Sequence, residues 1–177
     1  MANGHKTFRG QLLNSTNKKV YVRRFGLDKV EGWVDPQQYL RSDGIELITR
    51  TAQPIVIPYD QVRAVYFVRD FGKDPERDQR KEFISRPKLG GLWIRARFVD
   101  GGELEGVIPN DLRILGERGV TLTPPDSKGL TRRVFVPQVA LNECVVMGVI
   151  GKPDALRRKP KVRKSAPGQM DLFSTPV

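Results

Sequence analysis

The stretch "IRARFVDGGELEGVI", from Ile94 to Ile108, sets the expected fold. Apolar Ile94, Ala96 and Phe98 alternate with two arginines, which is the period-2 pattern of a half-buried β-strand. The "DGGE" that follows is typical of a tight hairpin turn, because glycine reaches positive φ without steric cost. Gly106 lies inside the second strand, where a glycine usually marks a sharp bend or a close backbone approach. The stretch therefore predicts a strongly bent β-hairpin.

The same pattern occurs earlier in the chain, in "VYVRRFGLDKVEGWV", which begins at Val20. Gly32 of this stretch aligns with Gly106 of the later one. Each copy also ends alike, in "PIVIPYDQVRAVYFV" and "RVFVPQVALNECVVM", where Pro58 aligns with Pro137. We interpret this self-similarity as an internal duplication. Each copy then predicts five short strands, with a short turn after the proline between the last two.

The segments "VRRFGLDKVEGWV" and "ARFVDGGELEGVI" resemble the first motif of the Sm-like proteins (Sm, Lsm and Hfq). That motif is an apolar strand, a turn and a second strand with an internal glycine. The resemblance implies an all-β fold class, with two tandem five-stranded small barrels. The general SH3-like barrel uses the same glycine and turn pattern and stays open as an alternative. Function does not follow from either fold.

The duplication divides the chain into five expected parts. They are an N-terminal arm (1–17), a first barrel (18–69), a charged connector (70–91), a second barrel (92–151) and a disordered basic tail (152–177). The connector contains "PERDQRKEF", which predicts about two helical turns with Glu76 and Arg80 spaced for an i,i+4 ion pair. Apart from these turns, we expect an exposed connector. The tail has several prolines and few apolar residues, which favours disorder.

The net charge of +11 is concentrated at the two ends of the chain. Four Lys or Arg and no acid lie between Met1 and Lys19, and seven Lys or Arg against two Asp lie between Gly151 and Val177. Basic arms on a nearly neutral body predict a polyanionic partner, DNA or RNA. The candidate nucleic-acid contacts in the tail are Arg157, Arg158, Lys159, Lys161, Arg163 and Lys164.

Sm-like proteins hold RNA with two loops, one after the second strand and one between the fourth and fifth strands. In this chain the later loops read "IPYDQV" and "VPQVAL", without the Arg-Gly or Lys-His pair of the family. In the earlier loops, Gln37, Gln38 and Tyr39, or Asn110, Asp111 and Arg113, could contact a base, Tyr39 by stacking; Tyr39 and Arg113 are the candidates taken forward. The alternative for Tyr39 is packing against its own barrel. The resemblance therefore does not carry the RNA site of the family with it.

The C-terminal segment "QMDLF" resembles the peptide by which bacterial replication and repair proteins dock on the sliding clamp. That pattern is Gln, an aliphatic residue, Ser or Asp, Leu and Phe; Gln169, Asp171, Leu172 and Phe173 fit it directly. Met170 replaces the commoner leucine with a side chain of similar volume. An unfolded segment that presents two adjacent apolar anchors suits a preformed apolar pocket on a partner. The alternatives are a tail that folds back on its own barrel and an accidental apolar cluster.

Catalytic and metal-binding groups are scarce in the sequence. His5 is the one histidine and Cys144 the one cysteine, so neither an internal disulfide nor a Cys/His zinc site is expected. Glu31 and Glu105 occupy equivalent positions, and we interpret them as surface charges. No stretch reaches the roughly 20 apolar residues of a membrane helix. We expect a cytoplasmic protein that is not an enzyme, with no cofactor, no metal and no membrane contact.

Together these observations predict a non-catalytic bacterial adaptor that docks on the DNA sliding clamp and contacts nucleic acid through basic arms. One alternative is an RNA-binding Sm-like regulator. Another is a structural module that forms a homo-oligomer through the edges of its barrels.

Overall fold

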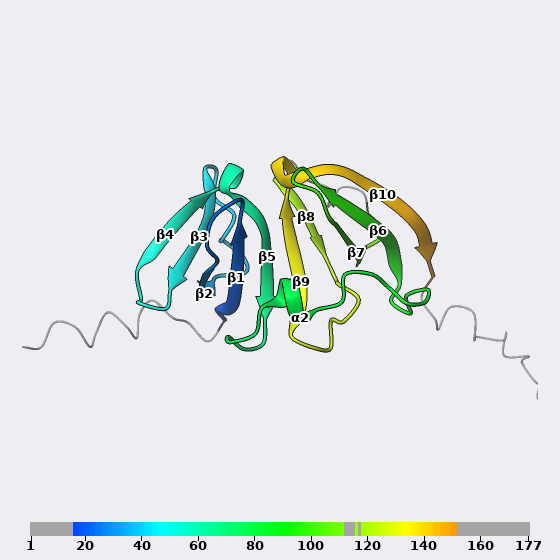
Figure 1. Cartoon of the computed structure of the whole chain (residues 1–177), viewed down its shortest axis with the longest axis horizontal. Coiled ribbons are helices and arrows are strands. Elements are labelled where there is room, and N and C mark those ends of the chain that lie inside the picture. The colour runs from blue at the N-terminus through cyan, green and yellow to red at the C-terminus, as the bar shows by residue number, and fades with distance from the viewer. Residues whose placement is uncertain (1–15, 112–115, 117, 152–177) are drawn as a thin grey trace, which may run out of the picture.

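The computed structural model describes residues 16–111, 116 and 118–151, and within them the protein is all-β, as expected. Apart from one short α-helix and two 3-10 turns, the regular elements of this part of the chain are β-strands. Figure 1 shows two groups of strands side by side, joined along β5 and β9.

The first copy of the repeat forms five antiparallel strands. They are β1 (Lys18–Arg24), β2 (Val30–Val34), β3 (Gly44–Thr49), β4 (Pro54–Pro58) and β5 (Val62–Val68), with a 3-10 turn at Tyr59–Gln61. Their spatial order is β4-β3-β2-β1-β5, so the last strand pairs with the first.

The second copy repeats the arrangement. Its strands are β6 (Gly91–Phe98), β7 (Glu103–Ile108), β8 (Gly119–Leu122), β9 (Thr131–Pro137) and β10 (Leu141–Ile150), with a 3-10 turn at Gln138–Ala140. The last strand, β10, again pairs with the first, β6, and β6 pairs with β7. A single bridge between Val107 and Thr123 connects β7 to the segment after β8.

Equivalent residues pair in the same register in both copies. Gly44 lies opposite Pro58 in the first copy, and Gly119 lies opposite Pro137 in the second. The last strand of each copy also carries a register shift near its start, where it pairs with the end of the first strand. Shared registers and a shared irregularity are what a duplicated fold predicts, because register is fixed by the apolar pattern and the turns.

The copies are joined by a strand ladder. Strand β5 of the first copy pairs antiparallel with β9 of the second, which places Val65 opposite Phe135. This ladder makes one seven-stranded sheet in the order β4-β3-β2-β1-β5-β9-β8, beside the three-stranded sheet β10-β6-β7. Neither copy closes into a barrel within the described residues, because no ladder joins β4 to β5 or β9 to β10. The expected closed barrels are therefore open, bent sheets.

Two apolar cores lie on either side of the β5–β9 ladder. The core of the first copy includes Phe135, which comes from β9 of the second. The core of the second copy includes Tyr21 and Tyr66, which come from β1 and β5 of the first. Each core thus contains side chains from the other copy, so burying the apolar faces of β5 and β9 holds the two copies together.

The glycine in each second strand allows a close approach, by the backbone of β3 at Gly32 and by a side chain of β8 at Gly106. A Cβ at Gly32 would lie 2.3 Å from the carbonyl oxygen of Ile48, and one at Gly106 would lie 2.5 Å from a methyl carbon of Leu122. The "DGGE" turn is also confirmed, with positive φ at Gly101 (87°) and Gly102 (82°). No other residue type fits these positions without strain.

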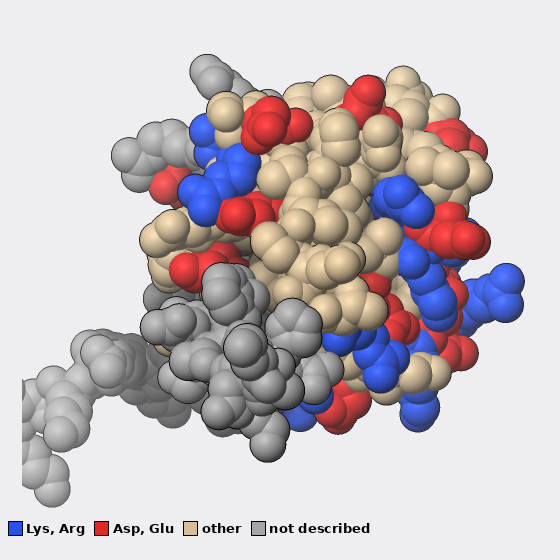
Figure 2. All heavy atoms as spheres, turned by 90° about the vertical axis from the view of Figure 1, so that its left-hand side faces the viewer, with Lys and Arg blue, Asp and Glu red and all other residues tan. Residues whose placement is uncertain are grey.

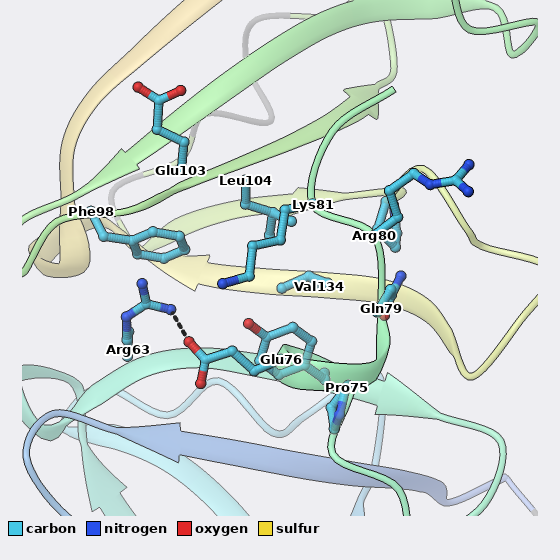
Figure 3. A pocket seen from close by; sticks show the side chains of 12 residues that line it. Arg63, Pro75, Glu76, Gln79, Arg80, Lys81, Phe98, Glu103, Leu104 and Val134 are labelled. Atoms are coloured by element: carbon cyan, nitrogen blue, oxygen red, sulfur yellow. Dashed lines mark hydrogen bonds and ion pairs between the residues drawn. The ribbon is translucent and has the colours of Figure 1, made fainter. Parts of the chain in front are cut away.

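The connector differs from the expectation. Its helix, α2 (Pro75–Asp78), is four residues long, and Glu76 does not pair with Arg80. Glu76 instead accepts from Arg63 of β5 at 2.7 Å and from Arg23 of β1 at 2.9 Å. Figure 3 shows Arg63 and Glu76 pointing toward one another while the guanidinium of Arg80 points away. The i,i+4 prediction was wrong because two arginines on the sheet offered Glu76 a more enclosed site.

Glu105 is likewise not a surface charge. It is 2% exposed, and it accepts hydrogen bonds from the Phe83 backbone N–H (2.9 Å), the Trp93 indole (3.2 Å) and Arg95 (2.8 Å). These donors hold the pKa of Glu105 below its usual value, although burial alone would raise it. This carboxylate therefore fastens the connector onto the second copy.

Candidate nucleic-acid interface

A groove of about 820 Å³ lies where the two copies meet. Its walls come from the start of β1, the end of β5 and the start of β9, together with the segment after β2. The lining residues are Asn17, Lys18, Lys19, Pro36, Tyr39, Phe67, Val68, Arg69, Asp70, Thr121, Arg132 and Arg133.

The directions of three neighbouring strands explain why cations gather in this groove. Strand β5 lies between β1 and β9 and is antiparallel to both. The beginnings of β1 and β9 therefore lie beside the end of β5, at the side of the sheet where these strands start or stop, which is the lower side in Figure 1. Each of these three strand ends carries basic residues: Lys18 and Lys19, then Arg69, then Arg132 and Arg133. Three segments far apart in the sequence thus supply one basic cluster.

The charge of the groove is strongly positive, with five Lys or Arg against one Asp among its lining residues. Asp70 is bonded to Lys19 at 2.7 Å, and that ammonium holds the pKa of Asp70 below its usual value. Lys18, Arg69 and the Arg132–Arg133 pair are exposed and form no ion pair with another described residue. Cations without a protein partner at one concave edge are suited to bind phosphate groups.

The family comparison covers this whole unit. Residues 16–148 match the model of DUF6982, a family of unknown function. The chain belongs to this family. No curated protein and no solved structure matches it.

The DUF6982 match contains the five groove cations and nearly all of the ten strands. The "QMDLF" segment lies beyond it. The groove therefore lies within the part of the chain that matches the family model, and the peptide lies outside it.

Tyr39 lies in the groove, but its ring is packed. It is 7% exposed and makes edge contacts with Phe67 (centroids 5.5 Å apart) and Phe135 (5.9 Å). Burial raises the pKa of Tyr39 to about 12. A base could not stack on a ring enclosed in this way, so the predicted stacking role was wrong and the alternative of packing holds. Phe67, which is partly exposed beside it, gives the groove an apolar floor.

The remaining predicted contacts fall outside the described residues. These are Arg113, the six basic residues of the tail from Arg157 to Lys164, and the clamp-binding segment Gln169–Phe173.

Sequence reasoning missed the groove cations. Their visible signal was two adjacent basic pairs, Lys18–Lys19 and Arg132–Arg133, each at the expected start of a strand. Only the β5–β9 ladder brings the pairs together, and no local pattern predicts that ladder.

We also searched the described part of the chain for a metal site, a membrane-spanning helix and a reactive cysteine. No group of three His, Cys, Asp or Glu residues there could hold a metal ion. None of its helices is long and apolar enough to cross a membrane. Cys144 is half-buried on β10, and burial raises the pKa of its thiol, so it is not an activated nucleophile.

Proposed function

We propose that the protein is a non-catalytic adaptor that binds the phosphate backbone of nucleic acid in its basic groove and docks on the bacterial sliding clamp through its C-terminal peptide. The groove is the observation that carries the first half of this proposal. The "QMDLF" pattern supports the second half.

The groove supports backbone binding for three reasons. Four of its five cations, all except Lys19, are exposed and form no ion pair within the described residues, so binding phosphate breaks few existing interactions. Four of the five cations lie within strands, two in β1 and two in β9, so their backbone is already ordered. Less conformational entropy is therefore lost when a ligand binds. The groove also has an apolar floor at Phe67 beside the cations, so it presents a concave surface rather than a flat charged face.

Backbone contacts without base readout predict binding that is independent of sequence and weakens with salt. The test is fluorescence anisotropy of labelled oligonucleotides with the full chain. We expect the double variant R132A/R133A to weaken binding at least about tenfold and to reduce the salt slope by about one per lost phosphate contact.

The matched control is R77A/K88A, which removes the same charge from exposed connector residues outside the groove. If both double variants lose affinity equally, net charge explains the binding and the groove does not. DNA and RNA oligonucleotides are compared in parallel; a strong preference for RNA would favour an RNA-binding regulator over an adaptor for a DNA clamp.

The clamp-docking half of the proposal is tested separately. Two adjacent anchors, Leu172 and Phe173, are expected to supply most of the binding energy, since a few apolar residues dominate such interfaces. The variant L172A/F173A should therefore abolish capture of the protein by an immobilised bacterial sliding clamp, whereas S174A/T175A should not. Deletion of residues 169–173 should have the same effect as the anchor variant. Undiminished capture of the anchor variant would contradict the proposal.

A further inference from the structure

The two described sheets have four outer strands: β4 and β8 in the seven-stranded sheet, β10 and β7 in the three-stranded sheet. The Val107–Thr123 bridge connects β7 to the segment after β8, which leaves one strand in each copy, β4 and β10, with an edge that no other described strand contacts. Figure 1 places them at opposite ends of the molecule. An unpaired edge exposes a row of backbone donors and acceptors and is a template for pairing with another strand.

The junction between the copies shows how such edges pair in this fold. By the shared registers, β10 is the equivalent of β5, and β4 is the equivalent of β9. Strands β5 and β9 form the ladder that joins the copies. The outer edges of β4 and β10 are therefore equivalent to the two edges that pair at the junction, but at the two ends of the molecule they have no partner strand.

The side chains at equivalent positions show the same relation. Phe135 of β9 is 2% exposed at the junction, while Val56, its equivalent on β4, is 44% exposed. Tyr66 of β5 is 5% exposed, while Val145, its equivalent on β10, is only partly buried. Apart from Glu143, which stands at the position of Ala64, apolar residues occupy these equivalent positions, and on the outer strands they are more exposed than at the junction.

Charges that would oppose strand pairing are few on both edges. Strand β4 has no charged residue, and β10 has one, Glu143, which is bonded to Arg97 at 2.7 Å. Figure 2 looks onto the β4 end and shows an uncharged central band with charged side chains around it. Arg86 donates to the carbonyl of Val149 on β10, but this lies beyond the stretch that corresponds to β5.

The outer edge of β4 has a few backbone donors and acceptors that another strand could pair with. The Thr49 amide donates to the Gln53 carbonyl at 2.9 Å, so alternation along the strand turns the polar groups of Val56 away from β3. Pro54 and Pro58 have no N–H but keep their carbonyls. Pro137 holds the equivalent place to Pro58 in β9, which nevertheless pairs with β5. One donor is lost relative to the junction, at Pro54, so the contact should be weaker than the internal one.

We propose that copies of this chain associate head to tail, with β10 of one copy adding antiparallel to β4 of the next. The register of the internal ladder assigns Cys144 opposite Val56 and Val145 opposite Ile55. This contact is heterologous, so it produces rings where the rotation closes and open chains where it does not. The basic groove is not part of this contact, so the proposed assembly can be tested independently of nucleic-acid binding.

The single native cysteine makes the register testable. In a hydrogen-bonded antiparallel pair the Cα atoms lie about 5.5 Å apart, which a disulfide can span. The variant V56C, oxidised as the full chain, should give a ladder of covalent oligomers on a non-reducing gel. Its matched control is V99C, a somewhat more exposed valine outside both edges, which should give no ladder.

The double variant V56C/C144S removes one side of each expected disulfide and should stop at a dimer at most. If V56C and V99C give the same products, or if V56C/C144S still gives a ladder, the proposed register is refuted.

A second measurement needs no cysteine chemistry. The light-scattering mass of the wild-type chain should rise with concentration between micromolar and millimolar. The variant V56K places a charge on the edge at an exposed position and should weaken association at least about tenfold, with V99K as the control. A wild-type protein that stays monomeric over this whole range would overturn the proposal.

Discussion

The two copies have the same strand registers, but equivalent residues meet different neighbours. Glu31 in the first copy has a side chain 16% exposed and pairs at 3.1 Å with Arg50, whose side chain is 63% exposed. Glu105 in the second copy has a side chain 3% exposed and binds the connector as well as Arg95. The connector backbone at Phe83 binds Glu105, whereas Glu31 pairs with Arg50 of its own copy, so the repeated carboxylate is a buried anchor in one copy and part of an ion pair at the surface in the other.

The same divergence appears at the equivalent bulges of β5 and β10. Arg63 contacts Glu76 at 2.7 Å, contacts Asp100 at 2.8 Å and lies 3.9 Å from the ring centroid of Phe98. Its equivalent in the second copy, Asn142, is exposed. A duplicated backbone therefore fixes where a side chain lies, while the neighbouring copy decides what that side chain does.

The largest expected effect compares the two glutamates. Glu105→Ala leaves the Phe83 amide, the Trp93 indole and Arg95 without their acceptor and should lower the free energy of unfolding by about 3 kcal/mol. Glu31→Ala removes a largely exposed pair and should cost less than about 1 kcal/mol. Urea denaturation of both variants measures the difference. Equal losses would mean that the connector does not depend on Glu105.

The next comparison is between the two bulges. Arg63→Ala removes two charge-assisted contacts and a cation–π contact at a side chain that is 12% exposed, and it should cost about 2 kcal/mol. Asn142→Ala should change stability by less than about 0.5 kcal/mol, as is usual at an exposed position. Thermal unfolding monitored by circular dichroism is the measurement. A neutral Arg63→Ala would show that β5 and β9 hold the copies together without this residue.

A smaller difference is expected between the two strand glycines. Alanine at position 32 meets a backbone carbonyl oxygen at 2.3 Å, which moves only with its strand, whereas the nearest atom to alanine at position 106 is a terminal methyl of Leu122 at 2.5 Å, which can rotate, and the Leu122 Cβ is farther away at 2.9 Å. Gly32→Ala should therefore cost about 1 kcal/mol more than Gly106→Ala. The comparison is made by urea denaturation of the two single variants. The reverse order would mean that the core around Leu122 is the more rigid of the two sites.

The smallest effect is the dependence of stability on pH. Since the folded protein holds the pKa of Glu105 below the ordinary value of 4.5, its ionised form stabilises the fold above that pH. This contribution is lost as the pH falls through the lower folded pKa. The stability difference between wild type and Glu105→Gln should therefore shrink below pH 4.5. A difference that stays constant down to acid pH would contradict the assigned shift.

The local pattern predicted much of the fold. Alternating apolar residues, two prolines and the "DGGE" turn indicated ten strands in two copies, and the structure has them in matching registers. These features are local, because strand period and turn geometry depend on a few neighbouring residues. The structure does not show the expected closed barrels, and the predicted Glu76–Arg80 pair was wrong. Both depend on contacts between segments far apart in the chain.

The candidate site, unlike the strands, could not be predicted from local patterns in the sequence. The sequence pointed to nucleic acid through its net charge and its basic ends, yet it did not identify the groove. The five groove cations come from three strand ends that meet only because β5 lies between β1 and β9. Tyr39 was chosen for an exposed role and is buried because Phe67 and Phe135, from both copies, enclose its ring.

The sequence by itself determined the β-strands, their turns, the duplication and the positive charge of this protein, since these follow from residue type and spacing. The tertiary structure alone decided that β5 and β9 pair, that Glu105 is an anchor, and that scattered cations form one groove. The physical reason is that a strand edge can pair with any compatible edge. Which partner it takes depends on burying apolar surface contributed by both copies at once, and a one-dimensional pattern does not record that surface.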